Sequence, residues 1–374
     1  MNTITPSFYR DKATAFLQKY ETQLSLGFFL GGFAFDIFTL SEPDDSFSII
    51  QQLVYLSIIG LIVCFEICTP TTELESPNMI RRLRLQSLWL YRRIIVHFIL
   101  GSLLSLYSLF YFKSSSFFVS FAFLAVLFGL LIANELERFQ NAPLPIRPAL
   151  FVFCLFSFFS ILVPLALGSV SFLTFTASLL AASLALFGMS WWLTHLKADP
   201  FILKTQLIRP GQGVLLFIGV FYLFGWIPPV PLAITEIGVY HKVEKFDGGY
   251  ILSHENPWYR FWQSGDQNFK SQPGDKLYVY AQIYAPKGFD DSIFVHWYYY
   301  SPSDGWQARD RIPMQIFGGR RSGFRGFVFK QNFDPGKWKV AIETRDGREI
   351  GRIHAEVLKV DSSSKQRQFT TEQR

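Results

Sequence analysis

Ionisable side chains inside otherwise apolar stretches are the first residues of this sequence that could do chemistry. They are Asp36, Glu66, His97, Glu135 and His195. Burying an ionisable group in lipid is costly, so such residues often mark an ion or proton path. If the apolar stretches are membrane spans, the last four residues fall at one depth. Two carboxylates and two imidazoles at one level could bind a divalent metal or relay protons, unless each simply reaches interfacial water.

A second candidate set lies in the last third of the chain, where aromatic and arginine side chains are frequent. Aromatic rings stack on sugars, and guanidinium groups pair with anionic polymers or headgroups. The candidates for such binding are Trp297, Trp306, Arg320, Arg321 and Arg325. The alternative is that the rings only pack the core of a small β domain. The histidines here lack metal-ligand spacing and no triad can be specified, so we assign no metal site, cofactor or catalytic residue.

Two kinds of element must position these residues, and the first is the long apolar helix. A helix needs about 20 apolar residues to cross the hydrocarbon core of a membrane. Seven stretches come close to this length, and prolines, glycines or charges separate them. The predicted spans are 24–41, 48–68, 94–112, 117–134, 148–168, 172–193 and 213–234. They predict a bundle over residues 24–234, preceded by a polar cytoplasmic segment, residues 1–23.

Charges between the spans predict the orientation of the bundle, because Lys and Arg favour the cytoplasmic side. With seven spans, thirteen basic residues share the side of the N-terminus, and only Lys113 lies on the other. The thirteen are Arg10, Lys12, Lys19, Arg81, Arg82, Arg84, Arg92, Arg93, Arg138, Arg147, Lys197, Lys204 and Arg209. We therefore expect a cytoplasmic N-terminus. An odd number of spans then places the C-terminal domain outside the cytoplasm, and an even number would reverse this.

The second kind of element is the short strand, which replaces the apolar runs from residue 235 onward. Apolar and polar residues alternate in 276–286 and in 292–300, as they do in half-buried strands. The Asp346-Gly347 pair is typical of a hairpin turn. Several short strands without a long helix predict an all-β, sandwich-like domain over residues 235–360.

The β region also resembles a known family in several short motifs. These are His296-Trp297, Gly318 to Arg321, Gly323 to Gly326, Pro335 to Val340 and Asp346 to Gly351. Together they resemble the domain of unknown function 2914, closely over residues 290–360 and loosely over 235–290. The resemblance implies a small bacterial β domain that is often attached to membrane spans, so we expect the protein in a bacterial inner membrane. That family has no established activity, so no functional residue is carried over. Phe327-Val328-Phe329 departs from its pattern, which affects packing.

These elements lead to two hypotheses of function. The leading one is a non-enzymatic membrane protein whose bundle displays the exterior β domain to bind or sense an envelope partner or glycan. The other is a transporter or membrane enzyme that uses the polar cluster at the cytoplasmic level. Because the basic residues are dispersed along the chain, we expect the bilayer but no nucleic acid as a partner. The polar tail, residues 361–374, is predicted to be disordered.

Overall fold

The computed structural model describes residues 43–68, 92–135, 146–255, 260, 262–317, 323–360 and 367–374. It divides into two units. The first contains most of the helical residues. The second consists of residues 110–121, 160–178 and 221–374, so it includes the ends of several helices as well as the β domain.

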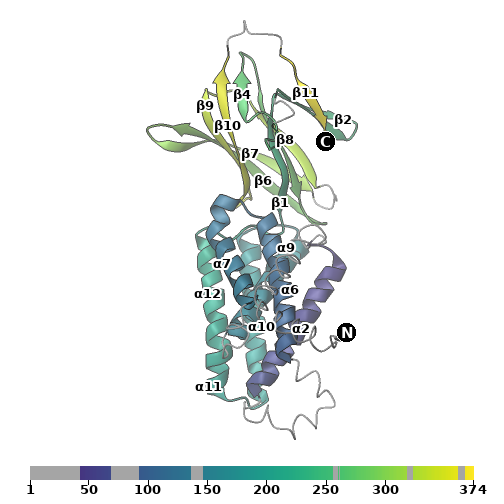
Figure 1. The fold of residues 1–374 in the computed structure, drawn as a ribbon, viewed down its shortest axis with the longest axis vertical. Helices are drawn as coiled ribbons and strands as arrows, with labels where there is room; N and C mark the ends of the chain where they lie inside the picture. The colour runs from purple at the N-terminus through teal and green to yellow at the C-terminus, as the bar shows by residue number, and fades with distance from the viewer. Residues whose placement is uncertain are drawn as a thin grey trace, which may run out of the picture. The chain divides into compact units, whose positions relative to one another are not determined.

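Apolar helices dominate the first part of the described chain (Figure 1). They are α2 (Ser46–Cys68), α6 (Arg92–Lys113), α7 (Phe117–Glu135), α9 (Ile146–Leu167), α10 (Phe172–His195), α11 (Pro200–Leu203) and α12 (Arg209–Leu223). Five stretches are long and apolar enough to cross a membrane, with Pro200–Leu223 counted as one. A shorter apolar helix, Phe118–Ile132, lies within α7. These lengths indicate a multi-pass membrane protein.

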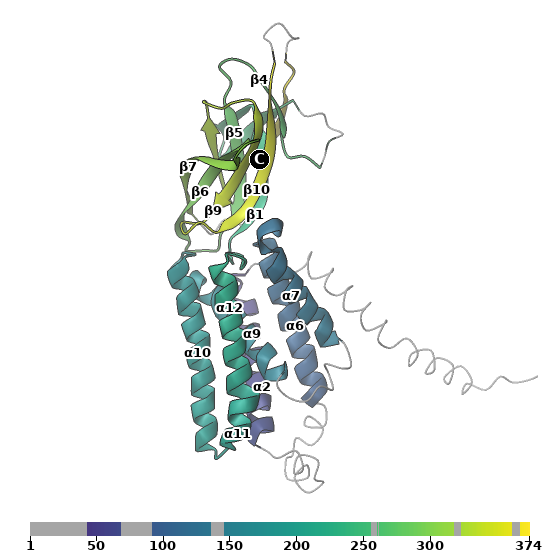
Figure 2. The ribbon, with the colours of Figure 1, turned by 90° about the vertical axis from the view of Figure 1, so that its left-hand side faces the viewer.

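The prediction of seven spans is therefore corrected to five long apolar helices and one shorter one among the described residues. The first predicted span, 24–41, and its candidate Asp36 lie outside the described residues, as does the segment 1–23. The predicted spans 48–68, 94–112, 148–168 and 172–193 each coincide with a long helix. The helices run alongside one another in Figures 1 and 2, as expected of a bundle.

The last predicted span, 213–234, begins too late and ends too late. The helix runs over Pro200–Leu223 and passes Pro210 through a π-helical turn, Lys204–Ile208. A π-turn before a proline lets the helix continue although the proline lacks an N–H, so Pro210 does not end it. Asp199 caps the start, its carboxylate accepting the Phe201 N–H at 2.7 Å. Beyond Leu223 the chain leaves the helix and enters the first strand at Ala233.

The predicted sandwich is present as two main sheets. A three-stranded sheet has the order β1-β5-β8, and a five-stranded sheet has the order β4-β10-β9-β6-β7. The strands are β1 (Ala233–Tyr240), β4 (Asn268–Ser271), β5 (Leu277–Tyr284), β6 (Asp290–Ser301), β7 (Gly305–Phe317), β8 (Phe324–Lys330), β9 (Gly336–Glu343) and β10 (Glu349–Lys359). Neighbours pair antiparallel except β4 and β10, which are parallel. The predicted hairpin joins β9 to β10, and Gly347 adopts a φ of 81° in its turn.

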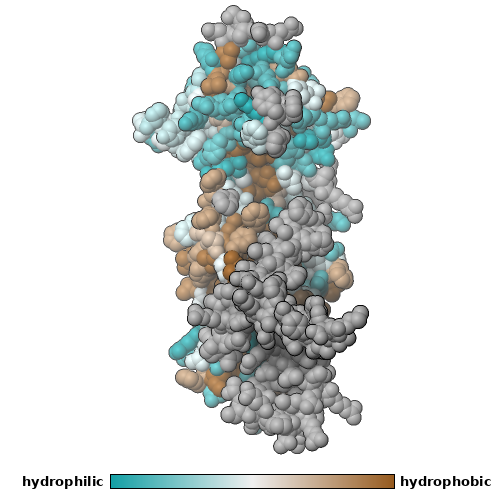
Figure 3. Space-filling view, in the orientation of Figure 1, coloured by the Kyte–Doolittle hydropathy of each residue, from teal (hydrophilic) through white to brown (hydrophobic). Residues whose placement is uncertain are grey.

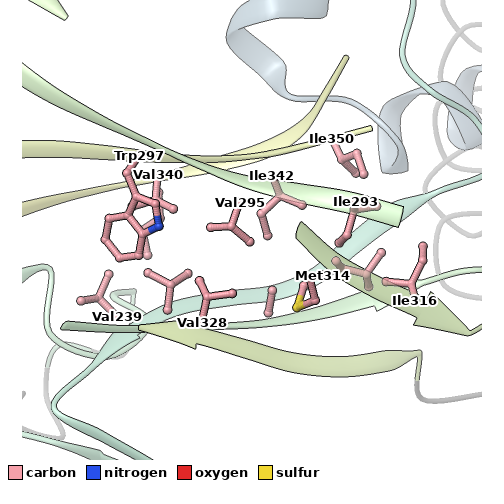
Figure 4. Packing of buried hydrophobic residues seen from close by; sticks show 14 of the residues in the cluster. Val239, Ile293, Val295, Trp297, Met314, Ile316, Val328, Val340, Ile342 and Ile350 are labelled. Atoms are coloured by element: carbon pink, nitrogen blue, oxygen red, sulfur yellow. The ribbon is translucent and has the colours of Figure 1, made fainter. Parts of the chain in front are cut away.

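The core of the sandwich lies between these two sheets (Figure 4). Val239 and Val328 from the three-stranded sheet lie opposite Val295, Trp297 and Val340 from the five-stranded sheet. All five are buried, and Trp297 is 0% exposed. Burial of this apolar surface holds the domain together, since none of the three cysteines lies in it and all are free. On the face visible in Figure 3, the coloured surface of the β domain is mainly hydrophilic and that of the helices is mainly hydrophobic.

A third, small sheet was not anticipated from the sequence. It has the order β11-β3-β2, formed by β2 (Lys242–Phe246), β3 (Gly249–His254) and β11 (Thr370–Gln373). It buries Tyr280 against Tyr240, on the side of β5 that faces away from the main core. Strand β11 corrects the expectation of a disordered tail: although residues 361–374 lack a hydrophobic period, backbone pairing with β3 orders 370–373. Residues 361–366 lie outside the described residues.

Candidate functional site

The polar residues predicted inside the spans have different surroundings. Glu66 near the end of α2 forms an ion pair with Arg147 of α9, with 3.3 Å between Oε1 and Nη1 and both side chains largely buried. His195 is exposed at the end of α10, with its Nδ1 2.8 Å from the Trp191 carbonyl oxygen. His97 is half-buried in α6. The Glu135 side chain lies outside the described part of the structure.

These residues do not form a described metal centre. Among the side chains that the structure describes, no three His, Cys, Asp or Glu residues lie close enough to hold a metal ion. The Glu66 carboxylate instead neutralises Arg147, which lowers the cost of placing either charge in an apolar helix. The predicted cluster therefore stays a prediction, because Glu135 and the separate candidate Asp36 lie outside the described part, whereas Glu66 is paired there with Arg147.

The predicted ligand-binding residues are distributed over both sides of the sandwich. Trp297 points into the core and is fully buried, so its ring packs against the domain instead of a ligand. Trp306 lies on β7 and is 39% exposed. Arg325 is half-buried on β8, which belongs to the other main sheet. Arg320 and Arg321 lie outside the described residues. Trp306 and Arg325 are thus not brought together.

Trp306 belongs instead to a continuous surface, the outer face of the five-stranded sheet. Side chains alternate across a strand, so the residues between the core residues of β6, β7, β9 and β10 point outward. Those linked to one another by ring contacts, hydrogen bonds or the electrostatic effect of a neighbouring charge are Phe294, His296, Tyr298, Tyr300, Trp306, Arg311, Lys339, Glu343, Arg352 and His354. We call this set the outer-face cluster. Within this cluster, Tyr300 lies opposite Trp306 and Tyr298 lies opposite Lys339 on neighbouring strands.

A hydrogen-bond network forms the centre of the outer-face cluster. The Tyr298 hydroxyl donates to Glu343 Oε1 at 3.0 Å and lies 2.8 Å from His296 Nδ1. The same His296 nitrogen lies 3.2 Å from Glu343 Oε2. Burial first, and then the Glu343 charge, raise the pKa of Tyr298 to about 12. Tyr298 is therefore a neutral donor at physiological pH, and the network holds its ring in one orientation.

A cation lies between aromatic rings next to this network. Lys339 Nζ is 4.1 Å from the centre of the Tyr298 ring and 5.4 Å from that of Trp306. The Trp306 ring in turn contacts Tyr300 at 5.3 Å and His354 at 5.7 Å between centres. Burial lowers the pKa of Lys339, and Arg352 lowers it further. Burial and the charges of Arg352 and Lys339 also lower the pKa of His354, so it is neutral at pH 7.

A second arrangement within the second unit joins helix ends to the β domain. The hydroxyl of Ser116, between α6 and α7, donates to Glu349 Oε1 at the start of β10. The N–H of Val170, between α9 and α10, donates to Asp291 Oδ2 on β6 at 3.1 Å. Both side-chain acceptors are held at the end of a strand. The turns between helices are therefore bonded to the β domain instead of being free loops.

A third connection is a stack of three groups at the end of α12. The ring of Tyr222 lies parallel to that of Phe175 from α10, with centres 3.4 Å apart and planes 8° apart. The Arg348 guanidinium covers the Tyr222 ring at 3.2 Å and donates to the Tyr222 carbonyl at 3.0 Å. Asp346 accepts from the Tyr222 hydroxyl at 3.3 Å. Both charged groups come from the β9–β10 turn.

Comparison with known families identifies the segment that carries the outer-face cluster. Residues 290–357 match the family model described as "Protein of unknown function (DUF2914)". This confirms the resemblance stated from the motifs. The DUF2914 segment contains β6, β7, β8, β9 and most of β10, and therefore every member of the outer-face cluster. The helices lie outside the matched residues. No curated protein matches the chain.

Solved structures resemble the chain only weakly. An immunoglobulin-like protein from Pseudomonas aeruginosa is 12% identical, with a TM-score of 0.20, over 33% of this chain and 98% of that one. A β-glucosidase from Listeria innocua is 13% identical, with a TM-score of 0.18, over 33% of this chain and 16% of that one. The DNA glycosylase AlkC from Pseudomonas fluorescens is 10% identical, with a TM-score of 0.20, over 85% of this chain and 99% of that one. Scores this low carry no argument about function.

Reasoning from the sequence did not identify Lys339, Glu343 or Arg348, which lie in the DUF2914 segment, as candidate functional residues. Lys339 and Glu343 lie on the outward positions of β9, where a charged residue is typical of any solvated strand. Arg348 follows the turn residues Asp346 and Gly347, so it was assigned only to a hairpin. A usable signal was present in β6, where Phe294, His296, Tyr298 and Tyr300 occupy four consecutive outward positions. Such a row exceeds what a solvated face requires.

Proposed function

We propose that this protein displays a ligand-binding β domain outside the cytoplasm and couples that domain to its membrane helices. The bundle anchors the domain, the outer-face cluster binds an envelope partner or glycan, and the helix-end contacts transmit the bound state. The single observation that carries the proposal is the stack of Phe175, Tyr222 and Arg348, since it ties two helices to one β turn.

Charge distribution supports the extracytoplasmic location of the domain. The helix connections bonded to the β domain, residues 114–116 and 168–171, contain no Lys or Arg, and Lys113 precedes the first. The connections at the opposite helix ends contain Arg81, Arg82 and Arg84 among others. Basic residues favour the cytoplasm, so the β domain belongs on the other side. This argument does not depend on the number of spans, whereas a cytoplasmic N-terminus additionally requires 24–41 to cross the membrane.

Cysteine labelling in intact cells tests the location. Ser303 lies in the exposed β6–β7 turn and Leu196 lies in the exposed α10–α11 turn. We expect a membrane-impermeant maleimide to label the Ser303→Cys variant in spheroplasts and the Leu196→Cys variant only after permeabilisation. The unaltered chain gives the background from Cys64, Cys68 and Cys154. Labelling in the opposite order would reject the proposed orientation.

Hydrogen exchange of the full chain in detergent tests the coupling. Arg348→Met removes the guanidinium over Tyr222, whereas Arg345→Met removes an exposed charge from the same turn. A partly desolvated cation–π contact contributes about 1–2 kcal/mol. We expect exchange to rise both in residues 344–348 and at the end of α12 in the Arg348 variant alone. Unchanged exchange at α12 would show that the stack does not couple the two elements.

A further inference from the structure

We propose that Lys339, Trp306 and Tyr300 form a binding subsite for a sugar residue that carries an anionic group. The proposal rests on the proposed function, in which the outer-face cluster binds an envelope partner or glycan outside the cytoplasm. It adds the chemical class of the ligand and the side chains that recognise it.

The aromatic part of the subsite is an exposed platform. Trp306 and Tyr300 are each 39% exposed, and their rings meet edge to face at 5.3 Å between centres. The apolar face of a pyranose ring covers such an indole ring well, because its C–H groups point to the π surface. The two rings come from paired positions of β6 and β7 and are held by the sheet. The platform is therefore formed before any ligand binds, which limits the entropy cost of binding.

Lys339 supplies the charge. Its ammonium group lies against the Tyr298 and Trp306 rings, and among the residues that the structure describes it forms no ion pair. The cation is half-buried, so it has lost part of its water, and the Glu349 and Glu343 charges act on it without forming an ion pair with it. An anionic substituent of a sugar stacked on Trp306 would form an ion pair with this ammonium group. A neutral sugar would leave the ammonium group as it is.

The other cations of the outer-face cluster are already compensated. Arg352 pairs with Glu349, with 2.5 Å between Nε and Oε1. Arg311 donates to the carbonyl oxygens of Thr344 and Arg345 and covers the Phe294 ring at 3.9 Å. Of the three outer-face cluster cations Lys339, Arg311 and Arg352, Lys339 alone has neither a carboxylate nor a carbonyl partner among the described residues. This favours a ligand with one anionic group on each stacked ring over a densely charged polymer.

Binding of defined sugars to the purified full chain tests the proposal. The main probe is an oligogalacturonate, in which every ring bears a carboxylate. Its methyl ester presents the same rings without charge, and glucose 6-phosphate replaces the carboxylate by a phosphate. Titration calorimetry in detergent measures all three without reference to the side of the membrane. A failure here is therefore separate from a failure of the proposed orientation or coupling.

The variants separate charge from stacking. Lys339→Met keeps the apolar stem and removes the charge, and Lys276→Met is its matched control, since Lys276 also lies over a ring, 4.9 Å from the centre of Phe329. We expect the unaltered chain to bind the acid about tenfold more tightly than the ester, as one charge-assisted contact allows. The Lys339 variant should lose this preference, and the control should keep it. Trp306→Ala should weaken both ligands about tenfold.

Four results would overturn the proposal. They are absence of binding by every probe, equal binding of acid and ester by the unaltered chain, equal effects of the two lysine variants, and an unchanged affinity of the Trp306 variant. Tighter binding of glucose 6-phosphate than of the uronate would support the subsite and assign its anion as a phosphate. Tighter binding of the uronate would assign it as a carboxylate.

Discussion

The two faces of the five-stranded sheet are formed by alternate residues of the same strands, yet they differ in chemistry. Toward the core, Ile293, Val295 and Trp297 of β6 are at most 1% exposed. Toward the outside, His296 and Tyr298 of the same strand form a polar network with Glu343. The inner face is explained by packing alone. The outer face is not needed for the core, and we propose that its aromatic rings and titratable groups serve in binding.

Removing the large ring from the inner face should have the largest effect. Trp297 is 0% exposed and meets Trp338 at 6.4 Å between ring centres. Trp297→Ala leaves a cavity between the sheets, and such changes cost about 3–5 kcal/mol. Urea-dependent pulse proteolysis of the full chain, following the β domain, measures this loss. A cost below about 1 kcal/mol would contradict the division into a packed and an available face.

A histidine that packs against the core, His241, should make the stability of the β domain depend on pH. The His241 ring stacks on the core residue Phe269 at 4.0 Å between centres. Burial first, and then the Arg367 charge, lower the pKa of His241 to about 4, although the Asp275 charge acts in the opposite direction. The unfolded chain takes up this proton near pH 6.5, before the folded chain does. The contribution of His241 to stability is therefore full above pH 6.5 and declines as the pH falls toward 4.

The expected decline is about 2–3 kcal/mol between pH 7 and pH 4. His241→Phe keeps a ring against Phe269 but cannot take up a proton. Its unfolding free energy should therefore fall less steeply over this range than that of the unaltered chain, because only the other acid-sensitive groups remain. Parallel pH profiles for the two proteins would show that His241 does not resist protonation in the fold.

Breaking the network on the outer face should cost less than opening the core. Tyr298→Phe removes the hydroxyl that donates to Glu343 but retains the ring beneath Lys339. Loss of one donor to a charged, largely buried carboxylate costs about 1–2 kcal/mol. The measurement is the same pulse proteolysis, at pH 7 where Tyr298 is protonated. A gain in stability would show that the network is strained instead of satisfied.

The smallest effect on stability is expected when a tryptophan on the outer face, instead of the core, is replaced by alanine. Trp306→Ala removes an indole that is 39% exposed and packs mainly on Tyr300 and His354. We expect a loss of less than about 1 kcal/mol, as is usual for surface positions. Comparison with Trp297→Ala in one experiment measures the asymmetry of the two faces directly. Similar costs for the two variants would mean that Trp306 is part of the core.

Alternation and turn chemistry were sufficient to predict the sandwich, because a strand with one buried face has a period of two that survives in β5 and β6. The helices were predicted where an apolar run ends in charge or proline, as at Lys113. The predicted start of the last span was wrong, because a π-helical turn, Lys204–Ile208, lets the helix continue past Pro210. The sequence also failed to predict β11, whose backbone pairing with β3 needs no hydrophobic pattern. The candidate site was only partly predicted, since the rings around Lys339 come from the β6–β7 hairpin, which β8 separates from β9 in the sequence.

The turn at Gly168 limits how this protein could be recombined with its relatives. Gly168 has a φ of 68°, and a Cβ there would lie 2.6 Å from the carbonyl oxygen of Gly288, which belongs to the turn before β6. The Gly168 carbonyl also accepts the Asp290 N–H. Two loops about a third of the chain apart must therefore change in concert. A chimaera cut at the helix-to-strand boundary would mismatch them, whereas one that moves residues 160–178 together with the β domain would keep the fit.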